Sequence, residues 1–469
     1  MRMNIKQLFA QVDMTEGKPW EKIVAFTIPM LIGNIAQQLY NTVDSIVVGR
    51  YVGDNALAAV GSASPILNLL LVLFVGISMG ASIMVSQYFG SRDRENLSRT
   101  IGSTITLTAA SSLLLMVLGA ALIRPVLILL NTPESILDWC ASYLFILLMG
   151  IAGVAYYNMF CGILRGLGDA LSALVYLSIA TVLNIILDVW FVAGFHMGVA
   201  GVALATVIAQ LASALLCLVK LRRMSHLFDM ELSYLKPHRG NILTVLKLGL
   251  PSGITQAIFS LAMVVVQSLT NSFGELVIAA NVIIMRVDGF AMMPNFSFGT
   301  AMTTYSGQNV GAKKLDRVRQ GAKEGTWIAV GTSAVITSLI LLFGRHLMGI
   351  FTSTEELVSL SANMMAILAV GYIAMAVTQS LSGVMRGAGD TMTPMWISVF
   401  TTVVVRVPLA YGIAYMTRTP ALPEGRYECI WISLLCSWVL GAAITLAVYW
   451  KGKWGGKAPE KRRWWRRRG

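Results

Sequence analysis

Arg165-Gly166-Leu167-Gly168-Asp169 returns as Arg386-Gly387-Ala388-Gly389-Asp390, at an offset of 221 residues (386 − 165). Further residues repeat at the same offset: Gly53 and Gly274, Ala58 and Ala279, Gln87 and Gln308, Gly90 and Gly311, Arg124 and Arg345, Glu134 and Glu355, Gly150 and Gly371, Gly162 and Gly383. Matches spread so widely at one spacing indicate two copies of one unit. In a membrane protein, two similar halves are typical of a transporter that holds its site between repeats.

The composition is that of a membrane protein. Of the 469 residues, 56% are hydrophobic and 13% are charged, whereas soluble domains carry about 25% charged residues. Apolar stretches long enough to cross about 30 Å of hydrocarbon recur along the chain. They predict twelve transmembrane helices: 23–48, 56–88, 101–122, 136–160, 170–194 and 198–219 in the first half, and 242–271, 278–307, 325–344, 357–383, 392–416 and 428–450 in the second.

The basic residues predict the topology. Most of the 36 Lys and Arg residues fall in the connections on one side of the predicted helices, which the positive-inside rule places in the cytoplasm together with both termini. Each half then has an even number of spans and starts on the same side, so the repeats are parallel and not inverted. The net charge of +13 is thereby explained by the cytoplasmic face, and we expect no nucleic-acid partner.

These patterns predict an all-α integral membrane protein with five segments. They are a cytoplasmic N-terminal segment (1–22), an N-lobe of six helices (23–219), a cytoplasmic linker (220–241), a C-lobe of six helices (242–450) and a basic cytoplasmic tail (451–469). The tail mixes Trp with Lys and Arg, so either it lies on anionic lipid headgroups or its charges only fix the topology.

Polar residues inside membrane spans are costly and are functional candidates by default. The first span carries Asn34, Gln37, Gln38, Asn41 and Asp44 at steps of three and four, which place them on one helical face. That face cannot contact lipid.

A second polar set lies in the fifth and sixth spans, at Asn184, Asp188 and Thr206. At 1.5 Å per residue from the outer helix ends, these residues and Asp44 lie at a similar depth. Their carboxylates, amide and hydroxyl offer oxygen ligands for a small cation such as Na⁺. Alternatively, two close carboxylates in a low dielectric share and carry a proton, or the set is a structural hydrogen-bond network.

The second half differs at the equivalent places. The seventh span has no acid, and Leu409 stands where the offset places the counterpart of Asp188. We therefore expect ion coupling in the first lobe only. Arg286, Asp288 and Arg406 are interpreted as structural charges, with a pair between Asp288 and Arg406. Residues considered for a substrate cavity are Asn34, Gln37, Gln38, Gln256, Met263, Met285, Arg286 and Met292, because Met is adaptable in apolar pockets.

Two local motifs bear on conformation. Pro29 and Pro251 begin the two halves and each removes a backbone hydrogen bond, which predicts either a bend coupled to protonation or a tolerated kink. The repeated Arg-Gly-x-Gly-Asp segment lacks the Gly-Lys-Ser/Thr pattern of a nucleotide-binding loop, so we predict a tight turn closed by an Arg–Asp pair.

Several segments together resemble the multidrug and toxic compound extrusion (MATE) family, in its DinF-like and MepA-like prokaryotic branch. They are Gln38-Leu39-Tyr40-Asn41-Thr42-Val43-Asp44, Val48-Gly49-Arg50, the two Arg-Gly-x-Gly-Asp turns, Gly307-Gln308-Asn309-Val310-Gly311-Ala312 and Val405-Arg406-Val407-Pro408. The resemblance implies twelve helices in two lobes that form a V. It implies a cation site on the first, fifth and sixth helices, which maps onto Asp44, Asn184, Asp188 and Thr206. The acids that another branch uses on the seventh and tenth helices are lacking.

The leading hypothesis is a secondary active exporter of bulky, often cationic organic compounds, driven by Na⁺ or H⁺ through alternating access. We expect no enzymatic activity, no cofactor beyond the coupling ion, small organic substrates, lipid contacts, a functional monomer and a prokaryotic cytoplasmic membrane location. A flippase for lipid-linked oligosaccharide or another lipid is the alternative, although it favours more spans and a strongly basic cavity. A receptor or scaffold does not need paired intramembrane acids, and an ATP-driven pump needs a nucleotide motif. Substrate identity and the choice between Na⁺ and H⁺ stay open.

Overall fold

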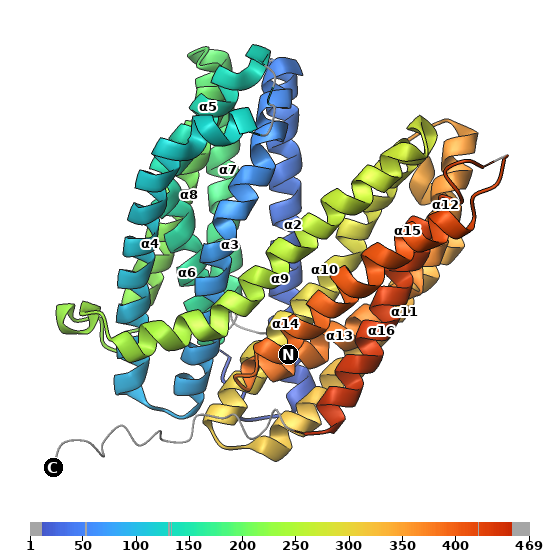
Figure 1. Ribbon diagram of the computed structural model, residues 1–469. Helices are drawn as coiled ribbons and strands as arrows, with labels where there is room; N and C mark the ends of the chain where they lie inside the picture. Colours follow the sequence, from blue (N-terminus) through green and yellow to red (C-terminus); the bar gives the residue numbers. More distant parts are fainter. Residues whose placement is uncertain (1–11, 52–53, 130–131, 133, 421, 453–469) are drawn as a thin grey trace. The chain divides into compact units, whose positions relative to one another are not determined.

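The computed structural model describes residues 12–51, 54–129, 132, 134–420 and 422–452; within its helices, side chains are not described for 39–51, 54–59, 61–62 and 64–65. The described chain folds into helices (Figure 1). It divides into two compact units. Unit 1 comprises Ile28–Gly253 with the segment ending at Asp13, and unit 2 comprises Met14–Thr27 with the chain from Ile254 onward.

Unit 1 holds the helices of the first half. They are α2 (Pro19–Tyr51, from Ile28 onward), α3 (Asp54–Gly90), α4 (Arg94–Leu129), α5 (Glu134–Met149), α6 (Ile151–Gly166), α7 (Ala170–Val189), the π-helix η1 (Trp190–Gly194), α8 (Gly198–Arg223), the 3₁₀ helix η2 (Leu232–Leu235) and the start of α9 (Arg239–Ser272). α3 and α6 lie in its centre and pack against α4 and α8, respectively.

Unit 2 repeats this order. After α9 come α10 (Glu275–Gly311), α11 (Leu315–Gly349), α12 (Glu355–Ala369), α13 (Gly371–Gly387), α14 (Met392–Val399), the π-helix η3 (Phe400–Arg406), α15 (Val407–Met416) and α16 (Cys429–Trp450). The central pair here is α10 and α13, which are the counterparts of α3 and α6.

Each of the twelve predicted spans coincides with a helix or with consecutive helices. Among the described residues, nine helices are long and apolar enough to cross a membrane, or up to eleven spans if each of two bent pairs is one span. The bends are 51° between α5 and α6 and 41° between α12 and α13. The remaining predicted span corresponds to α2, and the side chains of its residues 39–51 lie outside the described part of the structure.

Small residues explain how the central helices pack so closely. A Cβ added at Gly162 would lie 2.5 Å from the Ser78 carbonyl oxygen, and at Gly383 it would lie 2.3 Å from that of Gly299. Four residues later, Gly387 meets the Thr303 carbonyl oxygen in the same way, at 2.3 Å. Small residues four apart let membrane helices approach at the backbone, so the repeated glycines of the sequence are the packing contacts of both units.

The first Arg-Gly-x-Gly-Asp turn is not closed as predicted. In the first copy Asp169 accepts hydrogen bonds from the Ser172 backbone N–H at 2.9 Å and its hydroxyl at 2.7 Å, and forms a 3.2 Å ion pair with Lys220. It is an N-cap for α7, a favourable use of Asp at a helix start. Arg165 instead donates to the Ser78 hydroxyl at 3.3 Å. The pair failed as a prediction because a helix start offers Asp better-placed donors than an arginine on the preceding helix.

The unit boundaries also differ from the predicted lobes, because α2 and α9 each pass from one unit into the other. The first turns of α2 belong to unit 2, where the Met14 backbone N–H donates to Gln308 Oε1 at 2.9 Å and Lys314 donates to the Thr15 carbonyl at 2.9 Å. The first turns of α9 belong to unit 1, where a Cβ at Gly249 would lie 2.0 Å from the Gly76 carbonyl oxygen. The passages occur at 27–28 and 253–254, within two residues of Pro29 and Pro251.

Candidate cation-binding site

The fifth predicted span ends in an irregular segment that positions its polar residues. α7 begins at the Asp169 cap and runs to Val189, and the backbone then widens into the π-helix η1. His196 with φ of 54° and Gly198 with φ of 57° turn the chain, so that α8 returns alongside α7. π-Helical segments are frequent at functional sites, and this one begins two residues after Asp188.

Asn184, Asp188 and Thr206 come together inside unit 1. Both α7 side chains have 0% of their surface exposed. With its amide placed so that both polar atoms are satisfied, Asn184 donates to Asp188 Oδ2 at 3.0 Å and accepts from the Thr206 backbone N–H at 3.2 Å. The Thr206 hydroxyl oxygen lies 3.5 Å from Nδ2 in the alternative amide orientation. The grouping of these three residues expected from their depth is therefore present.

The remaining members of the predicted site are on α2. Asn41 and Asp44 lie in the part of α2 whose side chains are outside the described residues, so their place in the site stays a prediction. Asn34, Gln37 and Gln38 are half-buried on the same helix.

The chemistry of the described cluster suits a hard cation or a proton. It supplies a carboxylate, an amide oxygen and a hydroxyl oxygen, which are ligand types that alkali and alkaline-earth ions prefer over softer metals. A fully buried carboxylate is costly unless it is paired, protonated or bound to a cation. Asp188 is the fully buried carboxylate of this cluster.

The residues of unit 2 that were considered for a substrate cavity differ in their exposure. Gln256 and Arg286 are exposed, and Met263 and Met285 each have 41% of their surface exposed. Met292 is only 6% exposed and lies in the apolar core of unit 2. It is a packing residue in this structure, because its position on α10 turns it toward the bundle interior.

A row of amide side chains next to Met285 joins α9 and α10. Gln267 donates to Asn271 at 2.8 Å, and Asn281 donates to Gln267 Oε1 at 3.3 Å and contacts the Met285 sulfur at 3.7 Å. Sequence reasoning did not single out Asn281, although a lone amide in an apolar span is itself a signal. The row gives Met285 a polar neighbourhood.

The charges of unit 2 form a second cluster. The Tyr372 hydroxyl donates to Asp288 Oδ1 at 2.9 Å, and the Tyr372 carbonyl accepts from Asn295 at 3.2 Å. Arg406 is 8% exposed at the end of η3, with its charge acting on Asp288 and its Nε buried without a hydrogen-bond acceptor among the described residues. The predicted pair is not a direct contact: no ion pair or hydrogen bond joins Asp288 and Arg406 in the described structure, and Asp288 is contacted instead by Tyr372.

Comparison with known proteins identifies relatives along the whole chain. A model of the MatE family matches residues 29–190 and again 251–412, so the two matches coincide with the two repeats. The chain is 29% identical to the probable multidrug resistance protein YoeA of Bacillus subtilis over 454 residues, covering 94% of this chain and 97% of that protein. It is 26% identical to DNA damage-inducible protein F of Escherichia coli, with 91% of each chain covered.

Solved structures show the same fold. A MATE protein crystallised in the straight conformation superposes with a TM-score of 0.87 at 24% identity, covering 95% of this chain and 98% of that one. A transporter of the MOP superfamily from Pyrococcus furiosus superposes with a TM-score of 0.86 at 23% identity, covering 96% and 98%.

Proposed function

This chain belongs to the MatE family, and on that premise we propose that it is a secondary active transporter that exports small organic compounds, including bulky cations. The relatives with which it aligns over nearly their full length are named as multidrug resistance and multidrug export proteins. We infer that an ion gradient drives this export. The lipid-flippase alternative is not favoured by any of these relatives.

The observation that carries the coupling proposal is the buried contact of Asn184 with Asp188 and Thr206 in unit 1. We propose that Na⁺ or H⁺ enters at Asp188, with Asp44 and Asn41 of α2 as further contributors. Asn184 holds the carboxylate in one orientation, and Thr206 supplies a hydroxyl oxygen. Neutralising a fully buried carboxylate relieves a large desolvation cost, so occupancy favours one conformation of unit 1 over another.

The conformational change is proposed to use α2 and α9. Each helix belongs to two units, and each has a proline next to the residue where it changes unit. Proline removes one intrahelical hydrogen bond and so allows bending there. Bending of α2 after Pro29 would move Asn41 and Asp44 relative to Asp188, which links cation occupancy to alternating access.

We place the protein in a prokaryotic cytoplasmic membrane with both termini in the cytoplasm, following the distribution of Lys and Arg. The coupling ion is the only cofactor proposed, a monomer is the proposed functional form, and no nucleic acid is involved. The exposed Gln256, Met263, Met285 and Arg286 of unit 2 are proposed to contact substrate, since a soft, partly polar surface suits varied ligands.

The test is dye export in proteoliposomes with the Na⁺ gradient and the pH gradient imposed separately. We expect one gradient to drive transport and Asp188→Asn to abolish it. Asp138→Asn is the control, because Asp138 forms an exposed ion pair with Arg124. Full gradient-driven transport by a variant with both Asp44→Asn and Asp188→Asn would defeat the coupling proposal, and lack of transport by the parent with any cationic dye under either gradient would defeat the export proposal.

A further inference from the structure

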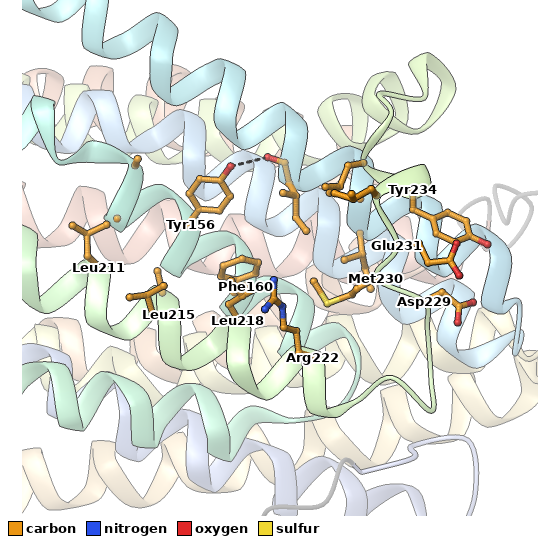
Figure 2. Close-up of a pocket in the computed structure, with 18 residues that line it drawn as sticks. Tyr156, Phe160, Leu211, Leu215, Leu218, Arg222, Asp229, Met230, Glu231 and Tyr234 are labelled. Carbon is orange, nitrogen blue, oxygen red and sulfur yellow. Dashed lines mark hydrogen bonds between the residues drawn. The ribbon is translucent and has the colours of Figure 1, made fainter.

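Unit 1 contains a cavity of about 400 Å³ away from the candidate cation site. It lies between α4, α6 and α8, and the segment Asp229–Leu235 covers one end of it (Figure 2). Volumes from about 300 Å³ upward are typical of small-molecule sites.

The walls of the cavity are apolar. Figure 2 shows Tyr156 and Phe160 of α6 facing Leu211, Leu215 and Leu218 of α8. The Tyr156 hydroxyl donates to the Ile105 carbonyl at 3.2 Å, so its polar group is satisfied and its ring serves as a wall. Gly153 keeps the inner end open, because a Cβ there would come within 2.9 Å of Leu211. The interior therefore suits a hydrocarbon chain.

The covering segment is fixed to α4 by side-chain bonds. Arg94 forms a 2.6 Å ion pair with Asp229, whose backbone N–H donates to the Ser98 hydroxyl at 2.8 Å. The Thr106 hydroxyl donates to the Leu235 carbonyl at 2.6 Å.

Gly102 completes this attachment, since a Cβ there would lie 2.0 Å from the Tyr234 carbonyl oxygen. The segment is thus held against α4 along its length, which makes the cavity a built feature of the unit.

The mouth of the cavity is charged. Arg222 lies at this end beside Phe160 and Met230, with Asp229, Glu231 and Tyr234 on the opposite side (Figure 2). Asp229 is neutralised by Arg94. Among the described residues Arg222 is exposed and has no hydrogen bond or ion pair, which leaves a cation available to an anionic group.

The length of the cavity along α8 and the exposure of its leucines suit a lipid. Leu211 and Arg222 are eleven residues apart on α8, about 16 Å, which is close to half of the roughly 30 Å hydrocarbon core. Two leucines that line the cavity are strongly exposed, Leu215 at 61% and Leu232 at 83%. Such exposure of leucines is expected of side chains in contact with acyl chains.

We propose that this cavity binds one phospholipid of the leaflet on the basic side of the protein, with an acyl chain between α6 and α8 and the phosphate on Arg222. The hydrocarbon fills the apolar walls, and the headgroup lies at the level of the fixed Asp229–Leu235 segment. The lining of the site does not include Asp188.

The experiment uses full-length protein in vesicles of phosphatidylethanolamine and phosphatidylglycerol with a trace of phosphatidylglycerol that carries a diazirine near the end of one acyl chain. After illumination, mass spectrometry maps the labelled residues. We expect labelling to concentrate on the stretches around Gly153 and Leu211, and to fall when unlabelled phosphatidylglycerol is added.

Two pairs of variants sharpen the test. Ala152→Phe fills the cavity and should remove this labelling, whereas Ala110→Phe, at an exposed position of α4 outside the cavity, should preserve it. Arg222→Gln should weaken labelling about fivefold, the effect of one interfacial cation, and Arg223→Gln, exposed and outside the cavity, should have a smaller effect. Thermal unfolding of each variant establishes that it is folded.

Equal labelling of Ala152→Phe and Ala110→Phe would overturn the site. Retained labelling in Arg222→Gln would overturn the phosphate contact. Displacement of the labelled lipid by a transported dye, without change elsewhere on the surface, would assign the cavity to substrate and also overturn the proposal.

Discussion

The Asn184 amide donates a 3.0 Å hydrogen bond to Oδ2 of Asp188 across one turn of α7. An amide is neutral, so this bond orients the carboxylate without compensating its charge. Because both side chains are fully buried, the orientation is fixed by packing as well. The contact therefore holds the Asp188 carboxylate in one orientation at the place where we propose that the coupling ion enters.

Replacing Asn184 or Thr206 by an apolar residue should weaken the coupling of transport to the cation while the Asp188 carboxylate is kept. We expect Asn184→Leu to raise the cation concentration for half-maximal transport about tenfold, since a hydrogen bond to a charged group contributes about 1.5–3 kcal/mol. Thr206→Val should raise it as well, because it removes a proposed hydroxyl ligand of the cation. Thr181→Val is the matched control, because its hydroxyl bonds only to the Leu177 carbonyl of its own helix. Concentration dependence of dye efflux measures the shift, and an unchanged value in both variants would contradict a role for these ligands.

The glycine contact of α13 with α10 should be essential for stability. Gly383→Ala places a methyl group 2.3 Å from the Gly299 carbonyl oxygen, and we expect a loss of about 1–3 kcal/mol from overpacking. Gly331→Ala is the control, since its Cβ has no atom within 4 Å and helix propensity favours Ala by about 1 kcal/mol. Thermal unfolding in detergent should lower the midpoint for the first variant only; equal midpoints would refute close backbone packing at this site.

Asp288 and Arg406 should be energetically coupled. Removing one member of a buried charge pair costs about 3–5 kcal/mol, whereas replacing both is far less costly. We therefore expect Asp288→Asn with Arg406→Leu to be more stable than Arg406→Leu alone, as judged by unfolding midpoints. The exposed pair Arg124 and Asp138 should show additive, small effects under the same double-mutant cycle. Additivity at Asp288 and Arg406 would mean that their charges do not interact.

The attachment of the segment after α8 should depend on pH. The hydrogen bond from Arg94 lowers the pKa of Asp229 below its usual value. A lowered folded-state pKa gives stabilisation that is complete above the usual carboxyl value of about 3.9 and is lost as pH falls through the lowered value. Hydrogen exchange of residues 225–238, corrected for its intrinsic pH dependence, should thus stay slow at neutral and mildly acidic pH and accelerate only below that range.

Two variants distinguish the loss of the Arg94–Asp229 pair from other effects of acid on the segment. Asp229→Asn should accelerate exchange of the segment already at neutral pH. Glu231→Gln should leave it slow, because Glu231 is exposed and accepts only a 3.2 Å bond from Ser233. Acceleration by both variants alike would show that the Arg94–Asp229 pair does not hold the segment.

The sequence predicted the helices well because their signal is local. Apolar runs and the 221-residue repeat located the long helices that the structure describes, and helical periodicity with depth grouped Asn184, Asp188 and Thr206. The breaks at Gly150 and Val370, where bent pairs form, carry no comparable signal, since apolar composition continues across both.

Contacts between residues far apart in the sequence could not be predicted from these local patterns. The assignment of Met14–Thr27 to unit 2 depends on backbone groups of Met14 and Thr15 meeting Gln308 and Lys314, and backbone groups leave no residue pattern. Met292 was considered for a cavity because of its residue type, whereas its burial depends on how α10 faces its neighbours. Arg165 was assigned to Asp169 by proximity in sequence, and helix capping proved the stronger interaction.

The passage of α2 and α9 between units has a consequence for biosynthesis. Met14, just before α2, pairs with Gln308 across 294 positions, so this early segment waits for partners that are synthesised much later. Unit 1 likewise lacks the stretch that covers Gly76 and Gly80 of α3 until α9 has been synthesised. A nascent chain halted after α8 therefore contains no finished unit, and a gene cut between the repeats would encode two halves that each miss a helix segment held by the other.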